Sequence, residues 1–189
     1  HYDFFAVIQR EPFLDELRAI GVENALYLPM AALPSMHRPL GGGTTGVRPD
    51  HNTGPDSTKS DSIRPATDKL TESDTRQFGA SVSFMGAGYP NRRLAFRALT
   101  DYDFKFWGTE WEGETRLARH WQMPGVRISS EQAVKIFNAA EINLNLHSSV
   151  KPEETVSFGD FVNPRTFEIA ACGAFQLVDE RGLLPELFA

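Results

Sequence analysis

Hydrophobic residues near the start of the chain form two short runs on either side of an amphipathic stretch. Asp3–Ile8 and Asn24–Pro29 each predict a short buried strand. Between them, Pro12–Ile20 has apolar residues at helical spacing, and Gly21 is a typical helix stop. One βαβ unit is too small to be a domain. We therefore expect it to close a domain that begins outside this chain.

A longer series of alternating strands and helices follows. Strands are predicted at Ser81–Met85, Phe104–Trp107, Val126–Ile128, Ile142–Leu146 and Ala174–Val178. Helices are predicted at about Asn91–Leu99, from a cap at Ser129 or Ser130 to about Ala140, from Asn163 and Pro164 to Gly173, and from Pro185 onwards. Strands that alternate with short helices predict the α/β class, with a doubly wound, parallel, Rossmann-like sheet.

The segment between these two parts has a different composition. No Phe, Tyr or Trp occurs between Tyr27 and Phe78, and from Gly41 to Gln77 the chain is rich in Gly, Pro, Ser, Thr and Asp. Such a segment cannot bury enough apolar surface to offset its ordering entropy, so we expect a poorly ordered linker without ligand contacts. The predicted organisation is the end of an N-terminal domain (1–39), a linker or insertion (40–77), and a Rossmann-like domain (78–189), whose last helix is expected to be cut short.

Composition and charge exclude several classes of protein. With 41% hydrophobic and 23% charged residues, the 189-residue chain is typical of a globular protein. A net charge of -6 gives no support for nucleic-acid binding. No apolar run is long enough for an integral membrane segment, and no basic-then-apolar leader begins the chain. The chain does not start with Met, so we expect part of a longer enzyme. The single Cys172 fits a cytoplasmic location.

The loop after the first strand of the Rossmann-like part is one candidate site, because ligands of such sheets bind beyond the carboxyl ends of the strands. Gly86 and Gly88 would let the backbone approach an anion, and Arg92 and Arg93 would add cations suited to phosphate. The alternative is a tight turn with two solvated arginines, and the sequence favours neither.

The helix after Asn163 holds the second candidate. Glu168 lies among apolar residues, where an unpaired carboxylate is costly and where a sugar's hydroxyl groups would supply hydrogen bonds. Arg165 lies one turn earlier, so a purely structural Arg165–Glu168 pair is the alternative. Asn143 and Asn145 share one face of their strand, which meets either solvent or a ligand cleft. The scattered histidines show no metal-binding spacing.

Four blocks of sequence together resemble a known family. They are Phe84–Arg93, Phe106–Trp111, Ile142–His147 and Asn163–Glu180, in this order. The order resembles the group-1 glycosyltransferase-like family that includes spore-maturation proteins, over Ser81–Phe188. The stretch Gly21–Ala31 is similar to the end of that family's N-terminal domain.

The resemblance implies a GT-B glycosyltransferase, with two Rossmann-like domains facing a cleft and a nucleoside diphosphate sugar as donor. Its partners would be that donor and a glycan or other acceptor. It also implies a pair of acidic residues spaced E-x7-E. Glu168 matches the second, which is expected to contact the donor's ribose, and Asp160 stands at the first, so these two are the candidate catalytic residues. The Asp at this first position leaves open whether the reaction retains or inverts the anomeric configuration.

The same resemblance assigns further donor-binding positions. Gly88 and either Arg92 or Arg93 match the region that faces the diphosphate. The first turn of the last-block helix, with Arg165, Thr166 and Phe167, would stabilise the negative charge on the leaving diphosphate. Arg127 lies in the 125–128 segment, which would hold the base through backbone groups, and Asn145 would line the cleft. No metal and no other cofactor is expected. A catalytic base from the acceptor domain would lie outside this chain, which leaves open whether the chain alone is active.

Two other functions remain possible on sequence grounds. A nicotinamide-dependent oxidoreductase would use Gly86 and Gly88 for the pyrophosphate and Glu110 for the ribose, but Asn91 replaces the third glycine of that fingerprint. A non-catalytic module that binds a nucleotide or glycan would share every motif.

Overall fold

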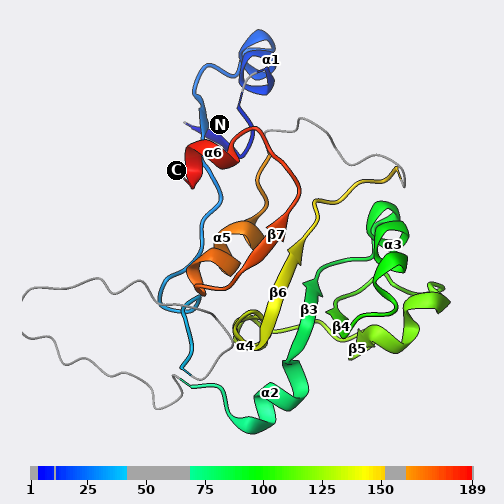
Figure 1. The fold of residues 1–189 in the computed structure, drawn as a ribbon. Coiled ribbons are helices and arrows are strands. Elements are labelled where there is room, and N and C mark those ends of the chain that lie inside the picture. Colours follow the sequence, from blue (N-terminus) through cyan, green and yellow to red (C-terminus); the bar gives the residue numbers. More distant parts are fainter. Residues whose placement is uncertain (1–3, 11, 42–68, 152–160, 189) are drawn as a thin grey trace, which may run out of the picture.

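A five-stranded parallel sheet forms the centre of the structure, a computed structural model that describes residues 4–10, 12–41, 69–151 and 161–188. Its strands are β3 (Ala80–Met85), β4 (Phe104–Trp107), β5 (Trp121–Gln122), β6 (Ala140–Asn145) and β7 (Gln176–Val178). They lie in the order β5-β4-β3-β6-β7 (Figure 1). β3 is central, and its Phe84 is in register with Phe106 of β4 and Leu144 of β6.

Helices connect the strands and cover both faces of the sheet. They are α3 (Pro90–Phe96) with the 3-10 turn η1 (Arg97–Leu99), the 3-10 helix η2 (Thr115–His120), α4 (Ser130–Ala139) and α5 (Pro164–Ala171). α3 and η2 pack in one core cluster, and α4 and α5 pack in another. The prediction of a doubly wound parallel sheet is therefore confirmed.

Aromatic rings fill the space between the sheet and α3. Phe84, Phe104 and Phe106 alternate with residues of the opposite face along their strands, so all three point toward this helix. The Phe84 ring lies edge-on to Phe96 of α3 at 4.7 Å, and Trp111 stacks on Phe96 at 5.8 Å. Each buried ring removes a large apolar area from water, which holds α3 against the sheet.

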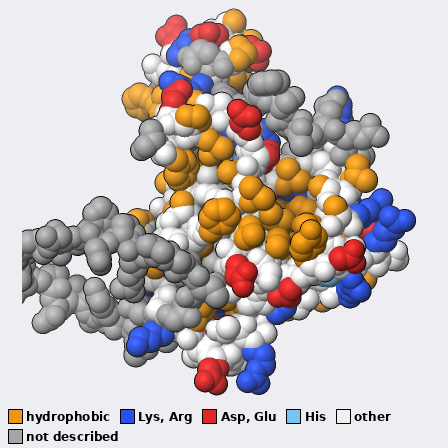
Figure 2. Space-filling model, in the orientation of Figure 1, with side chains coloured by type: hydrophobic (Ala, Val, Ile, Leu, Met, Phe, Trp, Pro, Cys, Tyr) orange, Lys and Arg blue, Asp and Glu red, His pale blue; other side chains and the backbone are white. Residues whose placement is uncertain are grey.

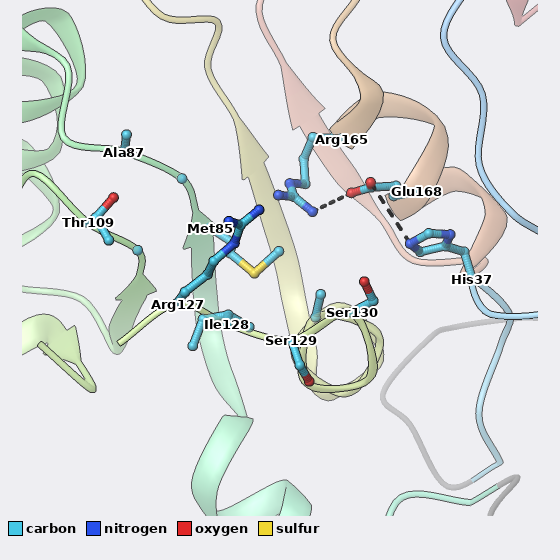
Figure 3. A pocket seen from close by; sticks show the side chains of 13 residues that line it. His37, Met85, Ala87, Thr109, Arg127, Ile128, Ser129, Ser130, Arg165 and Glu168 are labelled. Carbon is cyan, nitrogen blue, oxygen red and sulfur yellow. Dashed lines mark hydrogen bonds and ion pairs between the residues drawn. The ribbon is translucent and has the colours of Figure 1, made fainter. Parts of the chain in front are cut away.

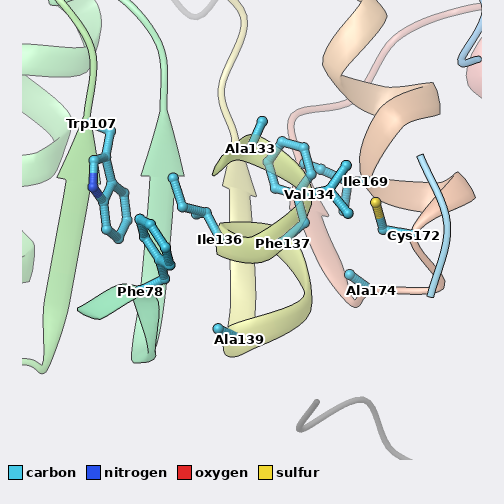
Figure 4. Close-up of a cluster of buried hydrophobic side chains, with 10 residues drawn as sticks. All are labelled: Phe78, Trp107, Ala133, Val134, Ile136, Phe137, Ala139, Ile169, Cys172 and Ala174. Atoms are coloured by element: carbon cyan, nitrogen blue, oxygen red, sulfur yellow. The ribbon is translucent and has the colours of Figure 1, made fainter. Parts of the chain in front are cut away.

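The second core cluster lies between the sheet and helices α4 and α5 (Figure 4). Trp107 of β4, Ile136 and Phe137 of α4, and Ile169 of α5 are each at most 1% exposed. Cys172 is fully buried in the same cluster, and burial raises the pKa of its thiol to about 11. Cys172 is therefore a packing residue of this cluster.

The direction of the chain reverses beside β3. From β3 it moves outward to β4 and β5, and α4 then carries it back to β6 on the other side of β3. In open α/β sheets, such a reversal leaves a crevice at the carboxyl ends of the strands. α4 begins at this edge, with Ser129 as its N-cap in a capping box with Gln132. Asn163 caps α5 and Pro164 opens it, as predicted.

One predicted strand is wrong. Val126–Ile128 pairs with no strand, and β5 is formed instead by Trp121 and Gln122, beside Phe106 and Trp107. Met123 and Gly125 have positive φ angles of 52° and 73°, so the chain turns away from the sheet before Val126. The predicted run therefore becomes a loop that leads into α4.

The predicted C-terminal boundary of the linker, Gln77, is also wrong, because Glu72–Phe78 forms a helix, α2. Thr71 caps it, and Asp74 completes a capping box by accepting from the backbone N–H of Thr71 at 3.0 Å. Phe78 is 3% exposed and joins the core next to Trp107. The rest of the predicted linker lies largely outside the described residues, since 42–68 are not among them.

The first part of the chain forms the predicted βαβ unit, with β1 (Phe5–Val7), α1 (Phe13–Ala19) and β2 (Ala25–Tyr27). The last helix, α6 (Leu184–Leu187), lies beside it (Figure 1). Arg10 and Glu186 form an ion pair of 2.7 Å between the two, so the first and last described parts of the chain meet.

Apolar side chains remain exposed at two places. In the βαβ unit, Phe4 is 70% and Ile20 is 78% exposed. Figure 2 shows hydrophobic side chains gathered where Figure 1 places β6 and β7, and Leu177 of β7 is 59% exposed. Within the described ranges, no helix has the length and apolar character needed to cross a membrane.

Candidate functional site

A pocket of about 320 Å³ lies at the carboxyl ends of β3 and β4, beside the start of α4 (Figure 3). Its lining residues come from the ends of β3 and β4, the loop before α4, α4 itself and α5. His37, which lies between β2 and α2 in the chain, completes the lining. The position is the one at which a Rossmann-like sheet binds ligands.

The end of the pocket at β3 and β4 is made of backbone. Gly108 has a φ of 130°, and a Cβ atom on it would lie 2.2 Å from the carbonyl oxygen of Gly86, so only glycine fits there. Two indole N–H groups hold these glycines: Trp111 Nε1 donates to the Gly86 oxygen and Trp121 Nε1 to the Gly108 oxygen, both at 2.9 Å. These hydrogen bonds hold the wall in place. Gly86 lies in the pocket lining, and its role in ligand binding stays a prediction.

Two arginines lie in the middle of the pocket, between the glycine end and α5 (Figure 3). The side chain of Arg127 is exposed and has no partner among the described residues. The guanidinium of Arg165 lies over the Phe137 ring at 5.3 Å. Burial lowers the pKa of Arg165 while the charge of Glu168 opposes the lowering, and an arginine stays a cation at neutral pH.

Glu168 and His37 form the opposite end. One carboxylate oxygen of Glu168, Oε2, accepts a hydrogen bond from Arg165 Nη1, so the predicted structural pair exists within the pocket. The other oxygen, Oε1, lies 3.9 Å from His37 Nε2. The Glu168 side chain is 20% exposed, so a ligand in the pocket can reach it.

The other predicted arginines lie outside the pocket lining. Arg92 is 9% exposed and donates through Nε to the Leu146 oxygen at 2.9 Å and through Nη1 to the Ala87 oxygen at 3.0 Å. Burial lowers the pKa of Arg92 to about 10. Its guanidinium lies between two loops and ties them together, a placement that does not support the predicted contact with phosphate.

Arg93 is held by backbone in the same way. Its three guanidinium nitrogens donate to the carbonyl oxygens of Gly88, Glu112 and Glu110. Gly88 is needed for packing, because a Cβ atom on it would lie 2.1 Å from the Glu110 oxygen. The space beside Gly88 is thus filled by protein backbone, which leaves no room there for the predicted pyrophosphate.

Three more predicted binding residues hold α5 in place. Asn145 is 2% exposed; its Nδ2 donates to Thr166 Oγ1 at 2.8 Å and its Oδ1 accepts from Asn163 at 2.8 Å. Thr166 is fully buried, and its backbone N–H is already bound by the Asn163 side chain. The Phe167 ring packs on Phe188 at 5.5 Å.

The polar face of β6 meets neither solvent nor the pocket. Asn143 is 1% exposed and accepts a hydrogen bond from Ser83 at 2.8 Å. His147, beyond the strand, is 4% exposed and lies 2.7 Å from Asp179, which also binds Arg181. Burial alone raises the pKa of Asp179, but the hydrogen bonds from His147 and the Arg181 charge lower it on balance.

Sequence reasoning thus identified Gly86, Arg127, Arg165 and Glu168 among the pocket residues and missed others. Asp160, the first position of the predicted acidic pair, lies outside the described residues. Gly108 follows the predicted strand β4 directly, a signal that could have identified it. His37 lies 131 positions from Glu168 in the chain, and no local pattern indicates that the two meet. Ile128 also lines the pocket and lies in the 125–128 segment that was predicted to hold the base. The remaining unpredicted lining residues are Met85, Ala87, Thr109, Ser129, Ser130 and Ala133.

A parallel sheet whose chain direction reverses beside β3 defines a Rossmann-like domain, and the pocket at its carboxyl edge is the candidate ligand site. A family model described as glycosyl transferase-like matches residues 91–189, and the chain belongs to this family. The chain is also similar to a spore protein, in line with the resemblance found in the sequence. The spore protein CgeB of Bacillus subtilis (strain 168) is 29% identical to this chain over 116 residues, which cover 54% of this chain and 35% of that protein. The chain thus spans about a third of the length of this relative.

Proposed function

We propose that this chain binds the nucleoside diphosphate sugar of a glycosyltransferase reaction and supplies the donor-binding part of the enzyme. The observation that carries the proposal is the arrangement within one pocket: Arg127 and Arg165 lie in the middle and the Glu168 carboxylate lies at one end. A diphosphate needs cations, and Arg binds phosphate oxygens through paired N–H groups. A ribose needs acceptors for its hydroxyl groups, and the Oε1 atom of Glu168 is such an acceptor.

The reaction in this proposal is a glycosyl transfer. An acceptor hydroxyl oxygen bonds to the anomeric carbon of the donor sugar while the bond from that carbon to the diphosphate oxygen breaks. The acceptor's proton passes to a base that we do not assign to a described residue. Negative charge grows on the leaving diphosphate, and Arg127 and Arg165 stabilise it in a preformed site. We propose that these arginines replace a metal ion in this role.

The geometry disfavours a dinucleotide oxidoreductase, but it does not distinguish the proposed enzyme from a non-catalytic binding module. A dinucleotide oxidoreductase would use the space beside Gly88, which the Glu110 backbone fills, and Glu110 does not line the pocket. A non-catalytic nucleotide- or glycan-binding module would keep the same pocket. Transfer of sugar by the complete protein, supplied with donor and acceptor, separates that module from an enzyme.

Thermal unfolding with added nucleotides tests the proposal. UDP, GDP and their sugar conjugates are compared with NAD, each in buffer containing EDTA. A ligand at about one hundred times its Kd stabilises the folded state by about 2.7 kcal/mol. We expect at least one nucleoside diphosphate to raise the melting temperature and NAD to leave it unchanged. A rise with NAD alone, or with no nucleoside diphosphate, would contradict the proposal.

A further inference from the structure

The residue that joins the pocket from the first part of the chain is His37. It lies in the segment Leu33–Leu40, here called the strap, which crosses over α4 and α5. The strap is bound to α4 through Asn138, which is fully buried. The Asn138 Oδ1 atom accepts from the Leu40 N–H at 2.7 Å, and Nδ2 donates to the Arg38 carbonyl oxygen at 3.2 Å. These bonds hold the strap in the position from which His37 enters the pocket lining.

Hydrogen bonds within the strap determine which ring nitrogen of His37 carries the proton. The backbone N–H of Leu33 donates to His37 Nδ1 at 3.2 Å, and the His37 N–H donates to the Leu33 oxygen at 2.8 Å. A backbone N–H can only donate, so Nδ1 is the acceptor and the neutral ring carries its proton on Nε2. His37 thus presents an N–H donor to the pocket.

This donor lies beside an acceptor that still has capacity. Arg165 binds Oε2 of Glu168, while Oε1 faces His37 Nε2 across 3.9 Å. That separation is too long for a hydrogen bond, so the two groups do not satisfy each other directly. Their side chains are 11% and 20% exposed, and both line the pocket (Figure 3).

We propose that His37 is a second binding residue for the ribose of the donor, and that His37 and Glu168 together recognise its two neighbouring hydroxyl groups. One hydroxyl donates to Glu168 Oε1, and the other accepts from His37 Nε2–H. The inference rests on the proposed function. It adds that recognition of the intact diol depends on a side chain contributed by the strap, outside the Rossmann-like domain.

Calorimetric titration of the full chain tests this inference with UDP or GDP, whichever binds more tightly, and with its 2′,3′-dideoxy analogue. His37→Ala removes one neutral hydrogen bond, so affinity for the normal nucleotide should fall about fivefold. Affinity for the dideoxy analogue should stay unchanged, because that ligand has no hydroxyl for His37. His37→Gln, which keeps an N–H donor, should recover part of the loss. Ser35→Ala, an exposed change in the same strap, should behave as the unmodified chain.

The outcomes separate this inference from the proposed function. If no nucleoside diphosphate binds the unmodified chain, both are wrong. If the nucleotide binds and His37→Ala binds it as tightly as before, only the His37 assignment is wrong. Equal weakening for the normal and the dideoxy ligand would show that His37 supports the shape of the pocket, and it would also overturn the assignment. Circular dichroism of each variant checks that the fold is retained.

Discussion

Arg93 and Arg127 differ in how many hydrogen bonds their guanidinium groups already make within the protein. Arg93 donates to three backbone oxygens, whereas Arg127 has no partner in the described parts of the chain and faces the pocket. The Arg93 guanidinium is directed toward backbone by all three of its nitrogens, which leaves it less available to a ligand than that of Arg127, although both residues follow the carboxyl end of a strand. The difference leads to opposite effects of the same substitution.

Arg127→Ala should weaken binding of a nucleoside diphosphate by about tenfold or more, because it removes a charge-assisted contact with phosphate. Its melting temperature without ligand should stay unchanged. Arg93→Ala is the matched control: it should lower the free energy of unfolding by about 1 kcal/mol, because three backbone carbonyl groups lose hydrogen bonds from its guanidinium, and leave the affinity of the folded protein unchanged. Calorimetric titration and urea unfolding measure the two quantities. If Arg93→Ala weakens nucleotide binding and Arg127→Ala does not, Arg93 is the residue that contacts the phosphates.

Glu168→Gln addresses the two interpretations of the acidic residue in α5. The Arg165–Glu168 pair is present, but both side chains are partly exposed, so its loss should cost less than about 1 kcal/mol of stability. If Glu168 binds the ribose, a charge-assisted bond becomes a neutral one, and affinity should fall about fivefold or more. Titration alongside thermal unfolding decides the matter. A lower melting temperature with unchanged affinity would leave only the structural role.

Among the elements, α2 shows how a short polar helix is kept in place. Asp74 accepts from Thr71 at its N-terminus and from Lys135 of α4, whose Nζ lies 2.8 Å from Asp74 Oδ1. The two bonds join the helix cap to the neighbouring helix. The Lys135 hydrogen bond is the main cause that holds the pKa of Asp74 at about 2, below its ordinary value of 3.8, although burial opposes the shift.

The stabilising effect of Asp74 should therefore depend on pH. As pH falls, the unfolded chain takes up a proton at Asp74 before the folded chain does, so the contribution is complete above about pH 5 and is lost toward pH 2. Asp74→Asn should lower the free energy of unfolding by about 1 kcal/mol at pH 7 and by much less at pH 2.5. Urea unfolding at both values measures this. Glu72→Gln on the same helix is the control, and a deficit independent of pH would contradict the account.

Local signals predicted most elements, and they failed where contacts between distant segments decide the structure. Ser129 and Asn163 were recognisable as helix caps because both are residue types whose side chains accept from the backbone N–H three residues ahead. The two-residue strand β5 was missed because its pairing with β4, and not its own composition, makes it a strand. For the site, Glu168 was identified from its apolar surroundings, whereas the hydrogen bonds of Arg92 to two backbone carbonyl groups and the approach of His37 depend on the fold as a whole.

At the scale of the molecule, the two sheets differ greatly in how much surface they bury. Strand β3 lies between two neighbours and under helices on both faces, whereas β1 and β2 pair only with each other. Of the apolar residues in the βαβ unit, Leu14 and Ala25 are buried. A two-stranded sheet with so little burial is marginally stable in water.

Hydrogen–deuterium exchange should show this difference directly. Backbone amides of β3 should exchange most slowly, since they open only with the main core, while amides of β1 and β2 should exchange through local opening that requires much less free energy. A saturating nucleotide should slow exchange in α4 and α5, which line the pocket, and leave β1 unchanged. Equal protection of β1 and β3 would show that the small sheet is part of one cooperative unit.

Two of the three tryptophans of the chain lie directly behind one wall of the pocket. Trp111 and Trp121 donate to the carbonyl groups of Gly86 and Gly108, whereas the Trp107 ring lies in the core cluster beside Phe78. A charged ligand placed against this wall should therefore alter the electric field at the indoles of Trp111 and Trp121. We expect the intrinsic fluorescence to change in a saturable way during titration with a nucleoside diphosphate, and the curve for Arg127→Ala to shift to higher ligand concentration. Unchanged emission during calorimetrically confirmed binding would place the ligand elsewhere.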